Sequence, residues 1–146
     1  MKKYVSIFLT IITITLLTGC GSKTKTLTCT KEETATGMNI KQTVNVNFKK
    51  SDVAQLKILE TITVEEAYTT YIEELKDVFE SQFANYNDKK GISMNTELKD
   101  RNIEISIVAD FKEMDDAAKA SLDIVNTKAN YDDMKKTFEN QSYTCK

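Results

Sequence analysis

The sequence predicts an α+β fold: an antiparallel β-sheet (a meander plus a hairpin) covered on one face by one long helix and one or two shorter C-terminal helices. Three patterns carry this prediction. Apolar residues alternate with polar ones through 38–48 and 54–62, recur at helical spacing through 68–86, and alternate again in 92–98 and 103–109. Strand side chains repeat every two residues and helix side chains every 3.6, so the order is sheet, helix, sheet.

The meander is expected to contain three strands. The first lies around residues 27–30, where apolar and polar residues alternate, and a turn follows over 32–37. The second strand is the clearest alternating stretch in the chain. A polar turn at 49–52 leads to the third strand, whose apolar face is expected to begin with Ala54.

Two polar residues interrupt the apolar faces of these strands. Gln42 breaks the alternation in the second strand, and Glu60 lies on the apolar face of the third. Glu60 is therefore interpreted as an edge position or as a functional exception.

The long helix is expected to begin at a capping box, with Thr63 as the N-cap and Glu66 three residues later. Gly91 and the polar residues before it supply the stop. The apolar stripe between these points is wide enough to face a sheet. It consists of Tyr68, Tyr71, Ile72, Leu75, Val78, Phe79, Phe83 and Tyr86.

The C-terminal part is expected to follow a hairpin with a tight turn at 99–102. A weak helical pattern starts at Lys112, and 124–129 is ambiguous. Asn130 is the expected cap of a last helix. A short terminal strand closes the chain around Cys145.

The N-terminus has the features of a lipoprotein signal peptide. Two lysines precede an apolar run over 4–17, which is too short to span a bilayer, and Leu17-Thr18-Gly19-Cys20 looks like a bacterial lipobox. We therefore expect residues 1–19 to be removed, and 20–26 to be a lipidated cysteine with a short tether. Residues 27–146 are then expected to form a single domain. The alternative is an uncleaved N-terminal anchor.

Lipidation of Cys20 implies acyl chains such as palmitate in the cell membrane, with the domain on the extracytoplasmic face. Export to an oxidising space favours a disulfide between the two remaining cysteines, Cys29 and Cys145. If the segments around them lie side by side as strands, the sulfurs can meet. Two buried thiols and a redox pair are the alternatives.

Composition argues against several functional classes. The full chain has a formal net charge of −2, and the leader contains two lysines and no acid, so the mature chain is more acidic still. This argues against nucleic acid as a partner. The chain contains no histidine, which removes the commonest general base and metal ligand. We therefore expect no enzyme activity, no metal and no cofactor.

Two surfaces remain candidates for binding. The first is an acidic ridge on the back of the long helix, which is also explained as a solvated face; it contains Glu66, Glu73, Asp77 and Glu80. The second is a ligand pocket between helix and sheet formed by Glu60, Tyr68 and Tyr71, although such an aromatic stripe more often belongs to the core.

A further acidic run at 110–116 lacks the spacing and glycine of a calcium loop. Acidic residues also belong at the first turn of a helix, where they oppose the dipole. We therefore interpret this run as a helix start.

The order of elements resembles that of the YehR-like bacterial lipoproteins. The hairpin opening at Gly91-Ile92 and the stretch Tyr131-Asp132-Asp133-Met134-Lys135-Lys136-Thr137-Phe138 followed by Tyr143 are similar to that family. The resemblance covers most of 27–146. The family usually has a glycine where this chain has Ser142, and the two paired cysteines are not expected throughout it. The resemblance implies the fold and the compartment and no catalytic residue.

The function expected from the sequence is therefore a non-catalytic binding or interaction role in the cell envelope. The protein would be anchored to the membrane by its N-terminal lipid and would contact an unknown envelope protein or a small ligand. The alternative is a small-ligand or metal-ion binding protein that uses the pocket between the long helix and the sheet.

Overall fold

The structure is a computed structural model that describes residues 24–121 and 127–146. The expected signal peptide, the lipobox with Cys20 and the first part of the tether lie outside these residues, as do residues 124–126 of the ambiguous stretch 124–129.

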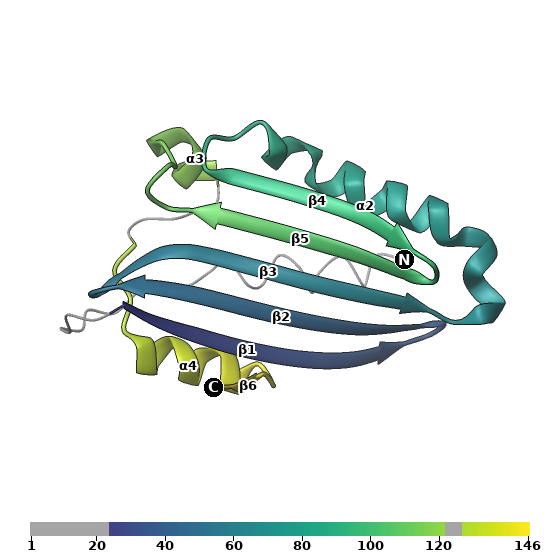
Figure 1. The fold of residues 1–146 in the computed structure, drawn as a ribbon, viewed down its shortest axis with the longest axis horizontal. Helices are drawn as coiled ribbons and strands as arrows, with labels where there is room; N and C mark the ends of the chain where they lie inside the picture. The colour runs from purple at the N-terminus through teal and green to yellow at the C-terminus, as the bar shows by residue number, and fades with distance from the viewer. Residues whose placement is uncertain (1–23, 122–126) are drawn as a thin grey trace.

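One six-stranded antiparallel sheet organises the fold, with the strand order β4-β5-β3-β2-β1-β6 (Figure 1). The meander and the hairpin form as the alternation predicted, and the terminal strand lies beside β1, as a bond between Cys29 and Cys145 requires. The strands are β1 (Thr24–Ala35), β2 (Met38–Lys49), β3 (Asp52–Val64), β4 (Ile92–Lys99), β5 (Asn102–Asp110) and β6 (Thr144–Cys145).

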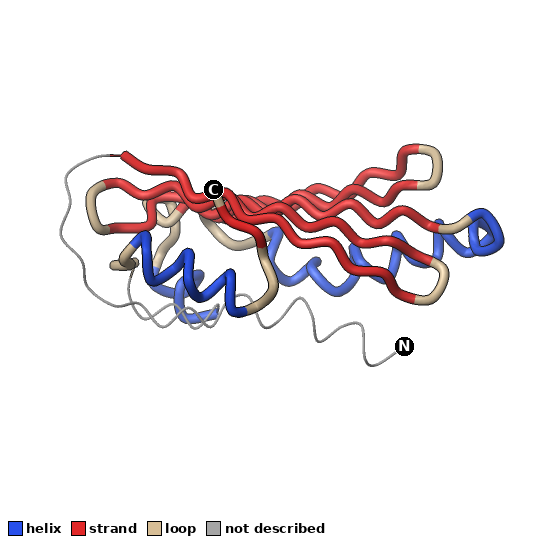
Figure 2. Tube along the Cα trace, turned by 90° about the horizontal axis from the view of Figure 1, so that it is seen from below, coloured by secondary structure: helices blue, strands red, loops and turns tan. Residues whose placement is uncertain are grey.

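The helices lie on one side of the sheet and leave its other face open (Figure 2). The longest helix, α2, runs beside β4, and α4 lies beside β1 and β6. The predicted α+β class is therefore confirmed. The helical elements are η1 (Glu66–Tyr71), α2 (Ile72–Asn87), α3 (Asp116–Ser121) and α4 (Tyr131–Asn140).

Two clusters of buried apolar side chains lie on the helix-covered face. The first is formed under α2 by Ile62, Val64, Ile72, Ile103 and Ile105. The second joins β1, β2 and β3 to α3 and α4, and its largest buried side chains include Leu27, Val46 and Phe48. Burying this much apolar surface is the main driving force for the fold.

The first strand is longer than the sequence predicted. β1 continues through the expected turn to Ala35, and only Thr36 and Gly37 form the turn. Glu32 pairs with Lys41 on β2, with 3.1 Å between Nζ and Oε1. Cross-strand pairs of opposite charge suit an exposed strand, so the acidic residues extend the strand instead of ending it.

The apolar face of β3 begins at Val53, not at Ala54 as expected. The register pairs Phe48 with Val53 but Asn47 with Gln55, so a β-bulge skips Ala54. Val53 is buried while Ala54 is only partly so. The extra residue changes the face on which the following side chains lie.

The predicted capping box is wrong. Thr63 belongs to β3, and its hydroxyl donates a hydrogen bond to Asn102 Oδ1 at 2.7 Å. The N-cap residue is Glu65, without a side-chain capping bond, and a 3-10 helix precedes α2. Pairing with β5 therefore outcompetes the local capping signal.

The other predicted helix starts are confirmed. Asp115 Oδ1 accepts a hydrogen bond from the Ala118 backbone N–H at 2.8 Å, which explains part of the acidic run at 110–116. Asn130 caps α4 by accepting hydrogen bonds from the backbone N–H groups of Asp132 and Asp133.

Two turn glycines make a matched test of backbone crowding. Gly37 and Gly91 have φ values of 78° and 80°, the left-handed region that favours glycine. A Cβ on Gly37 would approach the ring of the exposed Tyr68, which can move, whereas one on Gly91 would lie 2.6 Å from the Met114 backbone nitrogen. Urea unfolding should show that Gly91→Ala lowers the free energy of unfolding by more than Gly37→Ala, which itself costs roughly 1–2 kcal/mol. Equal losses would contradict the crowding at Gly91.

Candidate functional site

Two polar side chains lie together on the helix-covered face of the sheet. The register of β2 and β3 places Gln42 directly opposite Glu60. The Gln42 amide donates a hydrogen bond to the Glu60 carboxylate, with 2.9 Å between Nε2 and Oε2. Both residues are only 4% exposed. The two polar exceptions in the apolar pattern are therefore each other's partners.

Tyr143 joins this pair from the C-terminal end of the chain. Its hydroxyl donates a hydrogen bond to the Gln42 amide oxygen. Its ring packs edge-on against Phe138 of α4, with 5.3 Å between the ring centroids. Gln42 therefore connects Glu60 to Tyr143, and the three form the buried polar site.

Two charged residues of β1 border this site. Lys31 and Glu33 form an ion pair with each other. The Lys31 ammonium lies 5.6 Å from the centroid of the Tyr143 ring, a cation–π contact. The negative charge of Glu33 disfavours a second negative charge on Glu60 or Tyr143.

Burial controls the protonation of the site. It raises the pKa of Glu60 to about 7, against the opposing effect of the Gln42 hydrogen bond and with a smaller contribution from Glu33. Burial also raises the pKa of Tyr143 to about 12, so this hydroxyl keeps its proton near neutrality. The site can therefore bind and release one proton near neutral pH, on Glu60.

The structure places Glu60 and the two tyrosines of the predicted pocket in different elements. Tyr68 and Tyr71 lie in η1 and are 42% and 56% exposed. The Tyr68 ring lies against Gly37 in the β1–β2 turn. The tyrosine that shares the hydrogen-bonded network with Glu60 is Tyr143.

The predicted acidic ridge is an exposed surface of the helical segment. Glu66 lies in η1, while Glu73, Asp77 and Glu80 lie on α2, all of them exposed. Glu80 pairs with Lys76 at 2.8 Å, the spacing expected one helical turn apart. In the parts of the chain that the structure describes, no group of three or more Cys, Asp or Glu side chains is arranged to hold a metal ion.

Cys29 and Cys145 form a disulfide, as the sequence predicted. Cys29 of β1 lies directly opposite Cys145 of β6, with 4.1 Å between the Cα atoms. The backbone pairing continues to Thr28 and Lys146, whose amides and carbonyls exchange two hydrogen bonds. The disulfide thus fixes β6 to the sheet two residues from Tyr143.

The open face of the sheet is lined by hydroxyl and amide side chains. Thr28 donates a hydrogen bond to Asn45 at 2.8 Å, and Asn47 donates one to Gln55 at 3.1 Å. Leu59, at 37% exposed, is a large hydrophobic residue on this face. The face is therefore broad and polar.

Sequence reasoning singled out Glu60 and missed its link to Tyr143. The signal for Gln42 was present, because it interrupts the second apolar face just as Glu60 interrupts the third. Tyr143 is separated from Gln42 by 101 positions, and no local pattern connects them.

No helix within residues 24–121 and 127–146 has both the length and the apolar character needed to cross a membrane. The predicted lipid attachment at Cys20 falls outside those residues.

Two solved structures share this fold. A protein from Streptococcus pneumoniae TIGR4, solved by NMR, is 14% identical with a TM-score of 0.55 and covers 91% of each chain. The YehR protein of Escherichia coli, also solved by NMR, is 13% identical with a TM-score of 0.59, covering 86% of this chain and 92% of YehR. No protein-family model and no curated protein matches the chain. At these identities the likeness shows the fold alone, and that fold is YehR-like.

Proposed function

We propose that the protein is a membrane-anchored lipoprotein on the extracytoplasmic face of the cell membrane, where it has a non-catalytic binding or interaction role in the envelope. It would hold to the membrane through acyl chains on Cys20 and contact an envelope partner through its surface. Membership of the YehR-like lipoproteins is part of this proposal.

The disulfide between Cys29 and Cys145 is the main observation that supports the extracytoplasmic location. Structural disulfides persist in oxidising spaces and are rare in the cytosol. Export through a lipoprotein signal peptide would deliver the chain to such a space. The lipobox and the disulfide thus support the same location independently.

Ser142 supports the relation to the resembled family. Its φ is 69°, in the left-handed region that favours glycine. That is the position where the resembled family usually has a glycine, so a backbone conformation that suits glycine occurs here with serine in its place.

An interaction role agrees with the chemistry of the described residues. The open face of the sheet, which no helix covers in Figure 2, gives a partner a broad polar surface. The acidic side chains of the long helix are exposed and offer no enclosed site. The absence of histidine argues further against acid–base catalysis.

Replacing the lipidated cysteine tests the anchor. We expect the full chain, expressed in a bacterial host, to appear in the membrane fraction with a diacylglyceryl group on a mature N-terminal Cys20. Cys20→Ser should abolish the lipid mass and the processing at that site. A mature wild-type protein that lacks the lipid and stays in the soluble fraction would overturn the proposal. Crosslinking in intact cells would then identify the partner of the anchored form.

The buried polar site supports a second candidate, a small-ligand or metal-ion binding protein. A buried carboxyl beside a tyrosine hydroxyl is a common polar element of ligand pockets. Native mass spectrometry of the exported protein, purified without chelator, tests this alternative. An added mass that disappears in Glu60→Gln would favour it, and a bare protein mass would favour the interaction role.

A further inference from the structure

We propose that four lysines at the end of the sheet where β1 begins bind the anionic lipid headgroups of the bilayer that anchors the protein. This inference rests on the proposed lipid anchor. The four residues, which we call the lysine tip, are Lys25, Lys49, Lys50 and Lys128.

Three segments that are distant in sequence build the lysine tip. Lys25 comes from the start of β1, and Lys49 and Lys50 come from the end of β2 and the turn after it. Lys128 lies opposite Asp52 in an antiparallel bridge, and Asp52 in turn lies opposite Lys49. All four lysines are exposed. The fold therefore gathers positive charge that the sequence spreads over about a hundred positions.

Backbone hydrogen bonds hold the segment that carries Lys128 against the start of β3. The Ala129 N–H donates to the Ser51 carbonyl at 3.0 Å, and the Val53 N–H donates to the Thr127 carbonyl at 2.8 Å. The Lys25 ammonium lies 5.1 Å from the centroid of the Tyr131 ring. The lysines are thus carried on ordered segments that meet at one end of the sheet.

Among the described residues, acidic groups lie within the lysine tip and elsewhere at the same end of the sheet. The acidic run at 110–116 lies at this end, because Asp110 pairs with Gln55 near the start of β3. Asp52 lies within the lysine tip and accepts a hydrogen bond from the Thr127 hydroxyl. Asp132 and Asp133 lie in the first turn of α4. The N-terminus of that helix carries roughly half a positive charge, which compensates the two acids in part. Within the lysine tip itself, four lysines accompany one aspartate, so the formal charge of these side chains is positive.

The anchor brings the lysine tip to the membrane. Only four peptide steps separate Cys20 from Thr24, where β1 begins, and they span at most about 14 Å when extended. The Debye length at physiological salt is about 8 Å. Even at full extension, the start of β1 therefore lies within about two Debye lengths of the anchor point, and a less extended tether brings its charges closer to the surface potential of an anionic bilayer.

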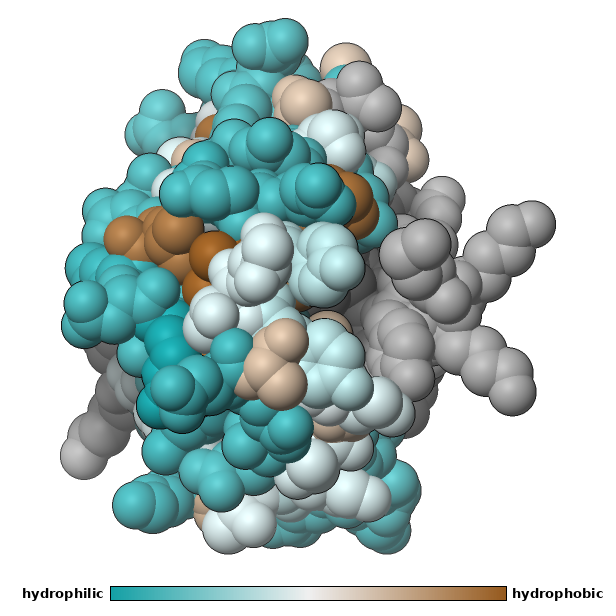
Figure 3. All heavy atoms as spheres, turned by 90° about the vertical axis from the view of Figure 1, so that its right-hand side faces the viewer, coloured by the Kyte–Doolittle hydropathy of each residue, from teal (hydrophilic) through white to brown (hydrophobic). Residues whose placement is uncertain are grey.

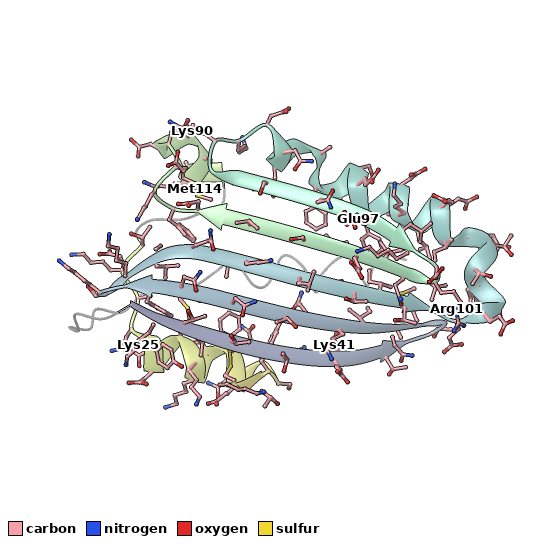
Figure 4. All side chains as sticks on the ribbon, viewed as in Figure 1. Lys25, Lys41, Lys90, Glu97, Arg101 and Met114 are labelled. Carbon is pink, nitrogen blue, oxygen red and sulfur yellow. A yellow bond between two sulfur atoms is a disulfide. The ribbon has the colours of Figure 1, made fainter. Side chains whose placement is uncertain are left out.

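The opposite end of the sheet carries several acidic side chains. Glu65 and Glu66 begin η1 there, and Asp100 lies in the β4–β5 turn beside Arg101 (Figure 4). The surface at that end is mainly hydrophilic, with small separate hydrophobic areas (Figure 3). An anionic bilayer would repel the acidic end and attract the lysine tip, which orients the domain with its long axis away from the membrane.

Acylation of lysines in the reconstituted lipoprotein tests the orientation. The lipidated wild-type protein is placed in vesicles of phosphatidylcholine alone or mixed with phosphatidylglycerol, and lysine labelling is read by mass spectrometry. We expect labelling of Lys49 and Lys50 to slow by about threefold or more in the anionic vesicles, and to recover at high salt. Labelling of Lys41 and Lys99, on the far half of the sheet, should not change.

Paired variants keep the test independent of folding. In Lys49→Gln/Lys50→Gln, the protection of Lys25 and Lys128 in anionic vesicles should fall. In the control Lys41→Gln/Lys57→Gln, which removes the same charge from the open face, it should persist. Equal labelling of the tip in both vesicles would overturn the inference. A wild-type protein that carries no lipid mass after purification from the bacterial host would instead show that the proposed lipid anchor is wrong.

Discussion

Removing the disulfide is expected to lower the free energy of unfolding by about 5 kcal/mol. The two cysteines enclose nearly the whole folded domain, with a sequence separation of 116. In the chain-entropy model, closing a loop of that size restricts the unfolded chain by roughly this amount, although strain and residual structure often reduce it. Cys29→Ala/Cys145→Ala is the suitable variant, because Cys29 is fully buried and alanine leaves no unpaired hydroxyl there.

Urea unfolding with and without reductant measures this effect. Wild type should lose stability on reduction, while the double alanine variant should not respond to reductant. If the disulfide only holds β6 locally, reduction would leave the urea midpoint nearly unchanged. Hydrogen exchange would then rise at the Lys146 amide, which bonds to the Thr28 carbonyl at 2.9 Å.

The alternating pattern of the sequence was sufficient to predict the sheet, and it also contained the bulge. Inward residues of β2 are even-numbered, as Val44 and Val46 show, and so are those of β3 from Leu56 onward. A two-residue turn at Lys50 and Ser51 pairs Lys49 with Asp52, which sets even against odd numbers. The apolar faces of β2 and β3 can both lie on the helix-covered side of the sheet only if one strand has an extra residue. The bulge at Ala54 provides that residue.

The start of the long helix could not be read from local signals. Thr63 and Glu66 match a capping box, yet the Thr63 hydroxyl bonds to Asn102 across the sheet. A capping bond is worth about 1 kcal/mol, and the strand pairing that replaces it is continuous with the Val64 N–H bond to the Arg101 carbonyl. Local preference therefore yields to tertiary pairing.

Only two of the three residues of the buried polar site could be predicted from the sequence pattern. Gln42 and Glu60 are visible as interruptions, but Tyr143 enters only through the terminal strand. Once Cys29 is paired with Cys145, the antiparallel register places Tyr143 beside Lys31, the neighbour of Gln42. The predicted disulfide, extended by its register, would therefore have placed Tyr143 near Gln42.

Glu60 should make the protein less stable as the pH rises through neutrality. Its pKa is near 4.5 in the unfolded chain and about 7 in the folded one. Between these values the folded state binds the proton more tightly than the unfolded state does, so the free energy of unfolding falls as pH rises and levels off above about 7. The shift corresponds to about 3 kcal/mol. Burial causes it, because the charged carboxylate loses its hydration and gains only the Gln42 amide in return.

Glu60→Gln isolates this contribution, because glutamine has the same shape as the protonated acid and never ionises. Relative to wild type, the variant should gain stability between pH 4.5 and 7 and be more stable by up to about 3 kcal/mol at pH 8. Glu33→Gln is the matched control, since Glu33 adds only a smaller repulsion to the same site. Urea unfolding across this pH range provides the comparison. A constant difference between wild type and Glu60→Gln would mean that Glu60 is ionised in the folded protein throughout. The buried carboxylate would then have to be held by groups beyond Gln42, which is the arrangement expected of a bound cation.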